Sequence, residues 1–370
     1  MLVHSDIQAK KTVADLQAWF QTHQRDLPWR KNYDPYEIWI SEIMLQQTQV
    51  ETVIPYFLRW KENLRGIKEV ASASQRELLK LWEGLGYYRR VKNIKATAEI
   101  LVERYQSRLP ENHGELLKLP GIGEYTAGAI LSIAYEAPFS VLDGNVARVF
   151  SRYFGWSLEI RTKESRDFFN RMSMKMLKYA RPRDFNQGLM ELGALVCLPA
   201  NPKCVVCPLV SRCHSHNKDL TRCLPVINKK KTIKLEQLFI ILKCAGSYFI
   251  KKQGEKELWP GLFSFPIIKM EGLGDQNQEI IRATKNRFSG NLIRLDALKK
   301  FKYSVTKYTV LVTPLLAELS YKTPQLDSLF LDGIWFEEKE LFQLPVSKPT
   351  KSILTMIGKG KRTKSKAAAE

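Results

Sequence analysis

Apolar residues change their spacing once along the chain, near residue 225, and the change separates two kinds of structure. Before it, apolar side chains recur every three or four positions, as they do on amphipathic helices. After it, short apolar runs such as 238–242, 248–250 and 305–311 are separated by Gly, Lys and Asn, which is typical of strands. The pattern predicts four segments: an all-α domain over 1–222, a linker over 223–234, a mixed α+β domain over 235–357, and a basic disordered tail over 358–370.

Helical spacing and capping residues define the first two helices. Apolar residues at helical spacing predict a helix over 6–24. Asp34, Pro35 and Glu37 then form a strong helix start: a capping side chain, a proline in the first turn, and a Glu three residues after the cap. From this start we predict one long helix that continues toward Val53. Further helices are predicted at 70–106 and 162–196.

A glycine turn between two apolar helical segments lies at 119–134. Leu116 and Leu117 end a short helix, Gly121 and Gly123 form a tight turn, and an apolar helix follows directly. That order predicts a helix–hairpin–helix unit. Free backbone N–H groups at the start of a helix, with no Cβ in the way, are well suited to hold a phosphate. An ordinary corner between two helices is the alternative reading of so short a motif.

Two further segments place aromatic residues beside arginines. Trp29 and Arg30 follow the first helix, and both surface packing and stacking on a nucleic-acid base are open there. In the segment 82–90, two glycines stand among aromatic side chains and two arginines. Such a loop can insert an apolar wedge into the minor groove while its arginines hold phosphates. A plain helix–helix turn is the other interpretation of this loop.

Two acidic residues occupy positions that are unusual for exposed carboxylates. Glu42 lies in an apolar helix with Trp39 and Leu45 on its face, so burial is expected to raise its pKa. An ion pair with a nearby basic residue is the ordinary alternative. Asp143 is a good N-cap for the helix that carries Val146, and it follows the hairpin helix closely enough for its carboxylate to face a bound strand as well.

Four of the six cysteines are concentrated in the segment 197–213, at a spacing of C-x6-C-x2-C-x5-C. They are Cys197, Cys204, Cys207 and Cys213. Thiolates so close together fit zinc or a cubane iron–sulfur cluster, and they indicate a metal site in a reducing compartment instead of a disulfide framework. Zinc sites usually use two C-x2-C pairs, and this segment has one. Cys223 and Cys244 lie outside the pattern and are predicted to be free thiols.

The charge balance favours a polyanionic partner. The chain has 58 Lys and Arg residues against 38 Asp and Glu, a net charge of +20. Charge alone does not separate DNA from RNA or a membrane surface. The apolar runs are too short to span a bilayer and residues 1–10 contain no apolar signal region, so we expect a cytosolic protein without a membrane partner.

Three features together resemble a known family: the segment 119–134, the run at 141–146, and the cysteine spacing. They are similar to the helix–hairpin–helix DNA glycosylases that carry an iron–sulfur cluster. Within that group the chain resembles the MutY-type adenine DNA glycosylases over nearly its whole length. Tyr125 stands where the related endonuclease III carries a catalytic lysine, and 259–266 resembles a segment of Nudix-like domains. Because 271–288 lacks the acidic metal-binding pattern of Nudix hydrolases, this domain is expected to recognise its ligand without hydrolysing it.

The resemblance implies a monofunctional enzyme that hydrolyses the N-glycosidic bond of adenine mispaired with 8-oxoguanine or guanine in double-stranded DNA. Glu42 would protonate the base. Asp143, kept ionised by hydrogen bonds from its helix start, would stabilise the cationic sugar, and Tyr125 and Asn145 would orient Asp143 and the sugar. Two alternatives stay open: a bifunctional glycosylase/lyase, which Tyr125 argues against, and a non-catalytic, redox-sensing DNA-binding protein, which the two carboxyls argue against.

The resemblance also assigns residues that bind DNA and the cofactor. Residues for the flipped adenine are Trp29, Arg30, Leu45, Val50 and Gln187. Residues that fill the vacated stack and touch the oxidised guanine are Gln47, Thr48, Leu85 and Tyr87. Gly121 and Gly123 would hold phosphates. Cys197, Cys204, Cys207 and Cys213 would hold a 4Fe–4S cluster, in a loop whose Lys203 and Arg212 contact phosphates. The expected protein is a monomer in the bacterial cytoplasm, associated with the nucleoid.

One stretch departs from the family pattern. Members of the family present Phe-Ser-His to the 8-oxoguanine, whereas the matching residues here are Val305, Thr306 and Lys307. Thr306 keeps the hydroxyl, but a lysine ammonium can only donate hydrogen bonds, while a neutral imidazole can also accept one. We therefore expect a weaker preference for 8-oxoguanine over guanine than in histidine-bearing members.

Overall fold

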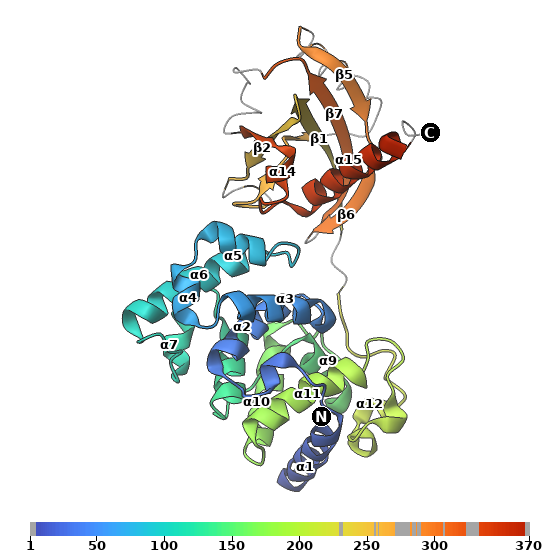
Figure 1. The fold of residues 1–370 in the computed structure, drawn as a ribbon. Coiled ribbons are helices and arrows are strands. Elements are labelled where there is room, and N and C mark those ends of the chain that lie inside the picture. The colour runs from blue at the N-terminus through green and yellow to red at the C-terminus, as the bar shows by residue number, and fades with distance from the viewer. Residues whose placement is uncertain are drawn as a thin grey trace. The chain divides into compact units, whose positions relative to one another are not determined.

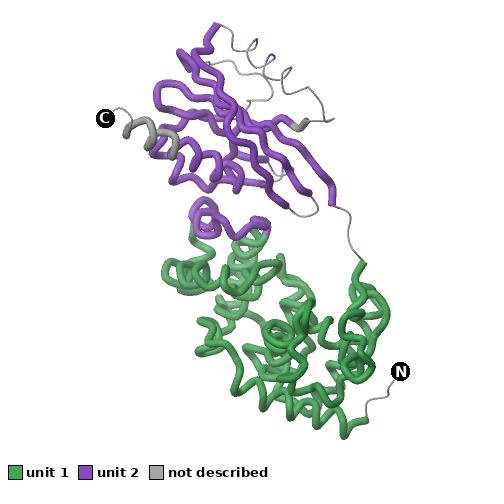
Figure 2. Tube along the Cα trace, turned by 90° about the vertical axis from the view of Figure 1, so that its right-hand side faces the viewer, with its two compact units in different colours: residues 1–73, 90–229 green, residues 74–89, 230–370 purple. Residues whose placement is uncertain are grey.

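The computed structural model of the chain divides into two compact units (Figure 2). Unit 1 contains residues 1–73 and 90–229, and unit 2 contains residues 74–89 and 230–370. The structure describes residues 5–228, 232–254, 257, 259–270, 282, 286, 290–305, 308–322 and 333–366. Thr306 and Lys307 lie outside the described residues, as does most of the segment 271–288.

The segment 74–89 belongs to unit 2, whereas the sequence pattern predicts it as part of the helical domain. It contains α5 (Gln75–Leu81) and the glycine loop that follows. The Nζ of Lys80 donates to the carbonyl oxygens of Phe342 and Leu344, at 2.8 and 3.3 Å. Contacts of this kind join residues that are far apart in the chain, so helical periodicity could not reveal them.

Unit 1 is all-α, and its helices α1, α9, α10 and α11 share one core in which Phe20 and Phe150 are fully buried. The helix predicted over 6–24 is confirmed, and Asp34 caps α2 as predicted by accepting a hydrogen bond from the backbone N–H of Glu37 at 3.1 Å. The helices are α1 Asp6–His23, α2 Pro35–Leu45, α3 Val50–Asn63, α4 Ile67–Ser72, α6 Arg89–Arg104, α7 His113–Leu117, α8 Glu124–Ala129, α9 Gly144–Phe154, α10 Lys163–Leu177, α11 Pro182–Leu195 and α12 His214–Asn217.

The single helix predicted over 35–53 is wrong, because a turn separates α2 from α3. Gln47, with a φ of 57°, lies in the left-handed region, where helical hydrogen bonding stops. The buried guanidinium of Arg90 supports this break. Its Nη1 donates to the carbonyl oxygens of Met44 and Gln46, at 2.9 and 2.7 Å. A distant arginine therefore satisfies carbonyls that the helix end leaves free.

Helices α7 and α8 and the turn between them form the predicted helix–hairpin–helix. Gly121 has a φ of 78°, and a Cβ there would lie 2.7 Å from the Cβ of Asn93, so both backbone and packing require glycine. Gly123 is the N-cap of α8 and supplies no side-chain cap. Both glycines are exposed, which leaves the backbone of the turn open to an anion.

Unit 2 is built on a mixed β-sheet (Figure 1). Strand β1 pairs in parallel with β7 along its whole length, from Ile233 opposite Tyr308 to Cys244 opposite Leu319. The described strands follow the order β3-β2-β1-β7-β5, with β4 beside β1, β6 beside β7 and β8 beside β2. They are β1 Ile233–Cys244, β2 Ser247–Lys252, β3 Phe263–Ser264, β4 Ile267–Met270, β5 Leu292–Ala297, β6 Phe301–Val305, β7 Tyr308–Leu319 and β8 Gly333–Glu337.

The apolar runs predicted as strands at 238–242 and 248–250 fall within β1 and β2. The run at 305–311 covers the end of β6 and the start of β7, with two residues between them outside the described ranges. Since β1 begins at Ile233, the connection between the two halves ends earlier than predicted.

The C-terminal segment is helical where a disordered tail was predicted from residue 358. Helix α15 spans Lys348–Lys366 and follows the short α14, Glu338–Leu341. Its start is well anchored, because Ile353 and Leu354 are buried and the Ser347 hydroxyl accepts from the backbone N–H of Thr350 at 3.4 Å. Extending a helix from an anchored first turn costs less than starting one, which favours continuation of α15 past residue 358. No helix in the described part of the chain is long and apolar enough to cross a membrane.

Replacing Arg90 with Leu is expected to lower the free energy of unfolding by about 3 kcal/mol, because the carbonyl oxygens of Ile43, Met44 and Gln46 lose their buried donor. Arg89→Leu changes an exposed neighbour and serves as the control. Thermal unfolding followed by circular dichroism makes the comparison. Equal melting temperatures for the two variants would show that the turn after α2 does not depend on Arg90.

Candidate active site

Glu42 carries a carboxyl group on the apolar helix α2. It is 5% exposed, and its Oε2 accepts a hydrogen bond from the hydroxyl of Tyr125 on α8 at 2.9 Å. Burial raises the pKa of Glu42 to about 7; the negative charge of Asp143 acts in the same direction, while the Tyr125 hydrogen bond and the positive charge of Arg30 oppose it. The predicted upward shift is confirmed. Its consequence is that protonated Glu42 is well populated near neutral pH.

Tyr125 contacts the carboxyl of Glu42. Its hydroxyl donates to Glu42, and it also lies 3.6 Å from the Sδ of Met190 on α11. The hydrogen bond to the Asp143 carboxylate from a predicted orienting side chain comes from Asn145, and the role of Tyr125 in orienting Asp143 and the sugar stays a prediction. Met190 had no chemical signal in the sequence that could have singled it out.

Asp143 caps α9 as predicted. Its Oδ1 accepts from the backbone N–H of Val146 at 2.7 Å, and its Oδ2 accepts from the Nδ2 of Asn145 at 2.9 Å. Burial nevertheless raises the pKa of Asp143 above its ordinary value, against the effect of these hydrogen bonds. Desolvation of the buried carboxylate therefore outweighs the hydrogen bonds from the helix start in setting the direction of this shift, and the expectation that Asp143 stays ionised remains a prediction.

Arg148 connects the Asp143 cap to the cysteine segment. Its Nη2 donates to the Oδ1 of Asn145 at 2.9 Å and its Nε donates to the carbonyl oxygen of Cys197 at 2.8 Å. Gly193 on α11 allows α11 to lie close to Asn145 on α9, since a Cβ at position 193 would lie 2.6 Å from the Cβ of Asn145. Neither Arg148 nor Gly193 was predicted from the sequence to belong to the site. For Arg148, the available signal was an arginine on an amphipathic helix, three residues after Asn145 and therefore on the same face as that side chain.

The neighbouring residues Trp29 and Arg30 lie near the start of the chain, and Arg30 contacts Gln187 from a distant helix. The Nε of Arg30, in the short 3₁₀ helix Pro28–Arg30, donates to the Oε1 of Gln187 on α11 at 2.8 Å. Gln187 is 3% exposed. Trp29 is buried too and packs edge-on against Phe57, with ring centroids 5.2 Å apart, so a surface position is excluded for it.

Two residues that the sequence analysis missed complete this cluster. Glu191, whose side chain is 1% exposed, accepts from the Nη2 of Arg30 at 2.9 Å and from the Nε of Arg25 at 2.7 Å. Burial alone would raise the pKa of Glu191, but the two arginines hold it below its ordinary value. A glutamate one turn after Gln187 on a mostly apolar helix was the signal that could have identified it.

The remaining predicted DNA-contact residues lie in turns or at the helix ends beside them. Leu45 ends α2 and Val50 begins α3, with both half-buried, while Gln47 is exposed and Thr48 is half-buried in the turn between them. The other two belong to unit 2. Leu85 is 5% exposed and Tyr87 is 42% exposed, with a φ of 50°. Of these two side chains, Tyr87 is the one open to a ligand.

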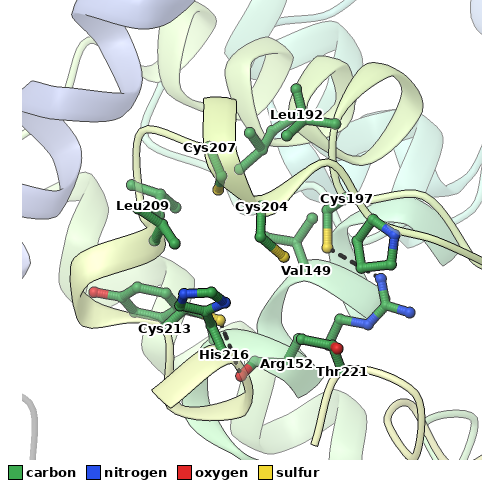
Figure 3. Close-up of a pocket in the computed structure, with 14 residues that line it drawn as sticks. Val149, Arg152, Leu192, Cys197, Cys204, Cys207, Leu209, Cys213, His216 and Thr221 are labelled. Atoms are coloured by element: carbon green, nitrogen blue, oxygen red, sulfur yellow. Dashed lines mark hydrogen bonds between the residues drawn. The ribbon is translucent and has the colours of Figure 1, made fainter. Parts of the chain in front are cut away.

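The four cysteines of the segment 197–213 surround one space (Figure 3). Val149, Leu192 and Leu209 form its apolar walls, and the Nη1 of Arg152 donates to the Sγ of Cys197 at 3.4 Å. Burial raises the pKa of Cys207 to about 12, so its thiolate requires a positive partner. Among the described residues, no three His, Cys, Asp or Glu side chains stand close enough to hold a single metal ion.

Arg212, predicted to contact phosphates, is engaged within the protein. Its guanidinium pairs with Asp15 and donates to the Oγ1 of Thr12 at 3.2 Å, which ties the cysteine segment to α1. Its side chain is 15% exposed. Lys203, the other basic residue predicted to contact phosphates, is exposed.

Proteins similar to this chain are DNA glycosylases. The profile of the family described as "HhH-GPD superfamily base excision DNA repair protein" matches residues 40–173, and the NUDIX domain profile matches residues 237–356. The adenine DNA glycosylase of Buchnera aphidicola subsp. Schizaphis graminum is 34% identical over 345 residues, which cover 92% of this chain and 96% of that protein. The adenine DNA glycosylase of Rattus norvegicus is 42% identical over 213 residues, covering 55% of this chain and 41% of that protein.

One solved structure extends the likeness to the fold. A thermostable thymine-DNA glycosylase superposes with a TM-score of 0.53 at 28% identity, covering 58% of this chain and 100% of its own. The predicted combination of a helix–hairpin–helix domain with a C-terminal Nudix-like domain is thus confirmed.

Glu42→Gln is expected to make the protein more stable above pH 7. The carboxyl of Glu42 has a pKa of about 7 when folded and an ordinary value of 4.5, so between these pH values the unfolded chain releases a proton that the folded chain keeps. The free energy of unfolding of the wild type therefore falls by about 3 kcal/mol across this range, while the amide variant avoids this loss. Melting temperatures at pH 4.5 and pH 8 measure the difference. The control is Glu62→Gln, on the exposed face of α3; the same response in both variants would contradict the assignment.

Proposed function

The chain belongs to the adenine DNA glycosylase family, and we propose that it excises adenine mispaired with 8-oxoguanine or guanine in duplex DNA, leaving the strand uncut. The observation that carries this proposal is the buried Glu42, a carboxylic acid with a pKa of about 7. Such a group is protonated often enough at neutral pH to act as a general acid.

Glu42 supplies the proton that the leaving base needs. Adenine is a poor leaving group as an anion, so a ring nitrogen must be protonated as the C–N bond breaks and the bonding electrons pass to the base. The hydrogen bond from Tyr125 fixes the direction of the carboxyl group. Because Glu42 is buried, bulk water does not compete for this proton.

Asp143 stabilises the sugar after the bond breaks. The sugar becomes an oxocarbenium-like cation, and a carboxylate beside it lowers the energy of that state, either as a counter-charge or through a transient bond. Val146 and Asn145 hold the carboxylate in place. Although burial raises the pKa of Asp143, the positive charge that develops on the sugar favours its anionic form.

Tyr125 supports the proposal that the strand stays intact. Strand cleavage by a lyase requires an amine that forms a Schiff base with the sugar, and a phenol cannot do so. The hydroxyl of Tyr125 is also occupied by Glu42. We therefore favour a monofunctional enzyme over the lyase alternative.

DNA binding is proposed to use the hairpin and the exposed turns. The backbone of Gly121 and Gly123 is open to a phosphate, and the net charge of +20 supplies nonspecific attraction. Gln47 and Tyr87 are exposed and have the chemistry to contact bases. The roles predicted for Thr306 and Lys307, and the weaker 8-oxoguanine preference, stay predictions.

A 4Fe–4S cluster is proposed as the group that the cysteine segment holds. Cys197, Cys204, Cys207 and Cys213 would be its ligands, since all four line one space, and the single C-x2-C pair in their spacing supports this choice over zinc. When bound, the cluster would cross-link the segment and keep the thiolates ionised. Arg152 contributes a hydrogen bond to the Cys197 sulfur.

Excision of adenine by the wild type and by Glu42→Gln tests the function. In single-turnover reactions with duplexes containing A opposite 8-oxoguanine or A opposite G, the wild type should yield an abasic site that breaks only after alkali treatment. Glu42→Gln should be about 10²–10⁴-fold slower, since the general acid is lost. Glu62→Gln should react at the wild-type rate. Strand cutting without alkali would exclude a monofunctional enzyme, and near-normal excision by Glu42→Gln would remove Glu42 from the mechanism.

Cys204→Ser is expected to lose iron together with much of the affinity for DNA. Cys223→Ser, which changes an exposed thiol outside the four-cysteine set, should retain both. Iron per chain by atomic absorption, and duplex binding by fluorescence anisotropy, provide the two measurements. Stoichiometric zinc without iron in the purified wild type would show that the cluster assignment is wrong.

A further inference from the structure

Each nitrogen of the Arg30 guanidinium is held by a different acceptor. Its Nε donates to Gln187 at 2.8 Å, its Nη1 to the carbonyl oxygen of Arg25 at 3.1 Å, and its Nη2 to Glu191 at 2.9 Å. We propose that Glu191, acting through Arg30, locks the side-chain amide of Gln187 in the one orientation that pairs with adenine and opposes 6-oxopurines. This inference rests on the proposed adenine-excising function.

The contact with Arg30 decides which end of the amide faces it. An arginine side chain has only N–H donors, so it can face the oxygen of Gln187 and never the NH₂ group. The Nε2 of Gln187 points instead toward the carbonyl oxygen of Arg183, at 3.5 Å, a contact too long to occupy it fully. A carbonyl oxygen has two lone pairs, so Oε1 can accept a second hydrogen bond from a base. The amide therefore offers an acceptor next to a donor in a fixed order.

Glu191 holds the arginine that makes this contact. Gln187 and Glu191 are four residues apart on α11, so they project from the same face of the helix. The Arg30 side chain is 10% exposed and would lose solvation without a compensating anion if Glu191 were apolar. Arg25 shares the carboxylate but makes no hydrogen bond to Gln187, which separates its effect from that of Arg30.

The side chains around Gln187 also belong to the proposed catalytic site. Met190, one turn along α11, contacts the hydroxyl of Tyr125, which donates to Glu42. The charge of Arg30 lies near enough to Glu42 to oppose the upward shift of its pKa. An adenine presented to Glu42 would therefore lie next to the amide of Gln187.

The fixed order of acceptor and donor matches adenine. On either of its polar edges, adenine offers the N6 amino donor beside a ring nitrogen acceptor, which complements Oε1 beside Nε2. Hypoxanthine replaces the amino group with O6, and on its Watson–Crick edge it presents an acceptor beside an N1–H donor. That order is the reverse, and an amide would have to turn over to pair with it. The lock on Gln187 opposes this rotation.

The ratio of adenine to hypoxanthine excision tests the lock. Single-turnover rates are measured with duplexes carrying either base opposite guanine, for the wild type, Arg30→Met, Glu191→Leu and the control Arg25→Met. A bidentate contact discriminates about 10–100-fold, so Arg30→Met and Glu191→Leu should lower the adenine/hypoxanthine ratio by about that factor. Arg25→Met should leave the ratio unchanged, because Arg30 keeps its carboxylate and its contact with Gln187.

Arg30→Met keeps the pair between Arg25 and Glu191, so it should fold even if Glu191→Leu does not. A purely structural role would slow excision of both bases equally and leave the ratio unchanged. The ratio of affinities for the adenine and hypoxanthine duplexes is also measured with each variant combined with Glu42→Gln. Variants that excise too slowly for a rate measurement can then still be compared. A ratio for Arg30→Met within about twofold of the wild type, by rate or affinity, would overturn the lock while adenine excision by the wild type stands. A wild type that excises neither base would overturn the proposed function itself, and the lock with it.

Discussion

The burial of one carboxyl group is the constraint on which the candidate active site depends. Glu42 carries its ionisable group inside an apolar helix, and burial raises its pKa to about 7. Burial of a carboxylate is costly, so the proton stays on the group where water would have removed it. The contacts around Glu42 exclude water and fix the orientation of its carboxyl group. Glu42 lies on α2, Tyr125 on α8 donates to it, and Met190 on α11 contacts that tyrosine.

The distribution of cations among the buried carboxyls separates their tasks. Glu191 receives hydrogen bonds from two arginines and stays ionised, which makes it suitable to hold other side chains in place. Glu42 receives a phenol instead of an arginine, and it stays ready to give up a proton. Asp143 lies between these cases, since backbone and amide hydrogen bonds support its charge but do not outweigh burial. Three carboxyls in one domain thus differ because of the donors that reach them.

Local features of the structure followed from the sequence, whereas features that depend on distant partners did not. The cap at Asp34, the cap at Asp143 and the hairpin at Gly121 each involve residues within a few positions of one another, and helix-start and turn chemistry predicted them. The turn at Gln47 was missed because the carbonyls before it are satisfied by Arg90, far along the chain. Periodicity over a short window contains no information about such a partner.

The same limit explains what could and could not be predicted about the site. The upward shift of the Glu42 pKa could be inferred, because the apolar residues around it lie on its own helix. The direction of the pKa shift of Asp143 could not be inferred, since it depends on how deeply tertiary packing buries the cap. Arg25 and Glu191 were missed for the same reason: each looks like an ordinary surface charge until α11 lies against the segment that follows α1.

The parallel pairing of β1 with β7 has a consequence for the order in which the chain matures during synthesis. The two strands are in register over their full length although β7 is made much later, and such non-local parallel pairing forms slowly. The helices of unit 1 are complete before that, whereas the segment 74–89 belongs to unit 2 and its partners Phe342 and Leu344 are made after β7. Domains generally fold as units from the N-terminus. The nascent chain therefore assembles most of its helical half first, and α5 and the glycine loop reach their final contacts among the last.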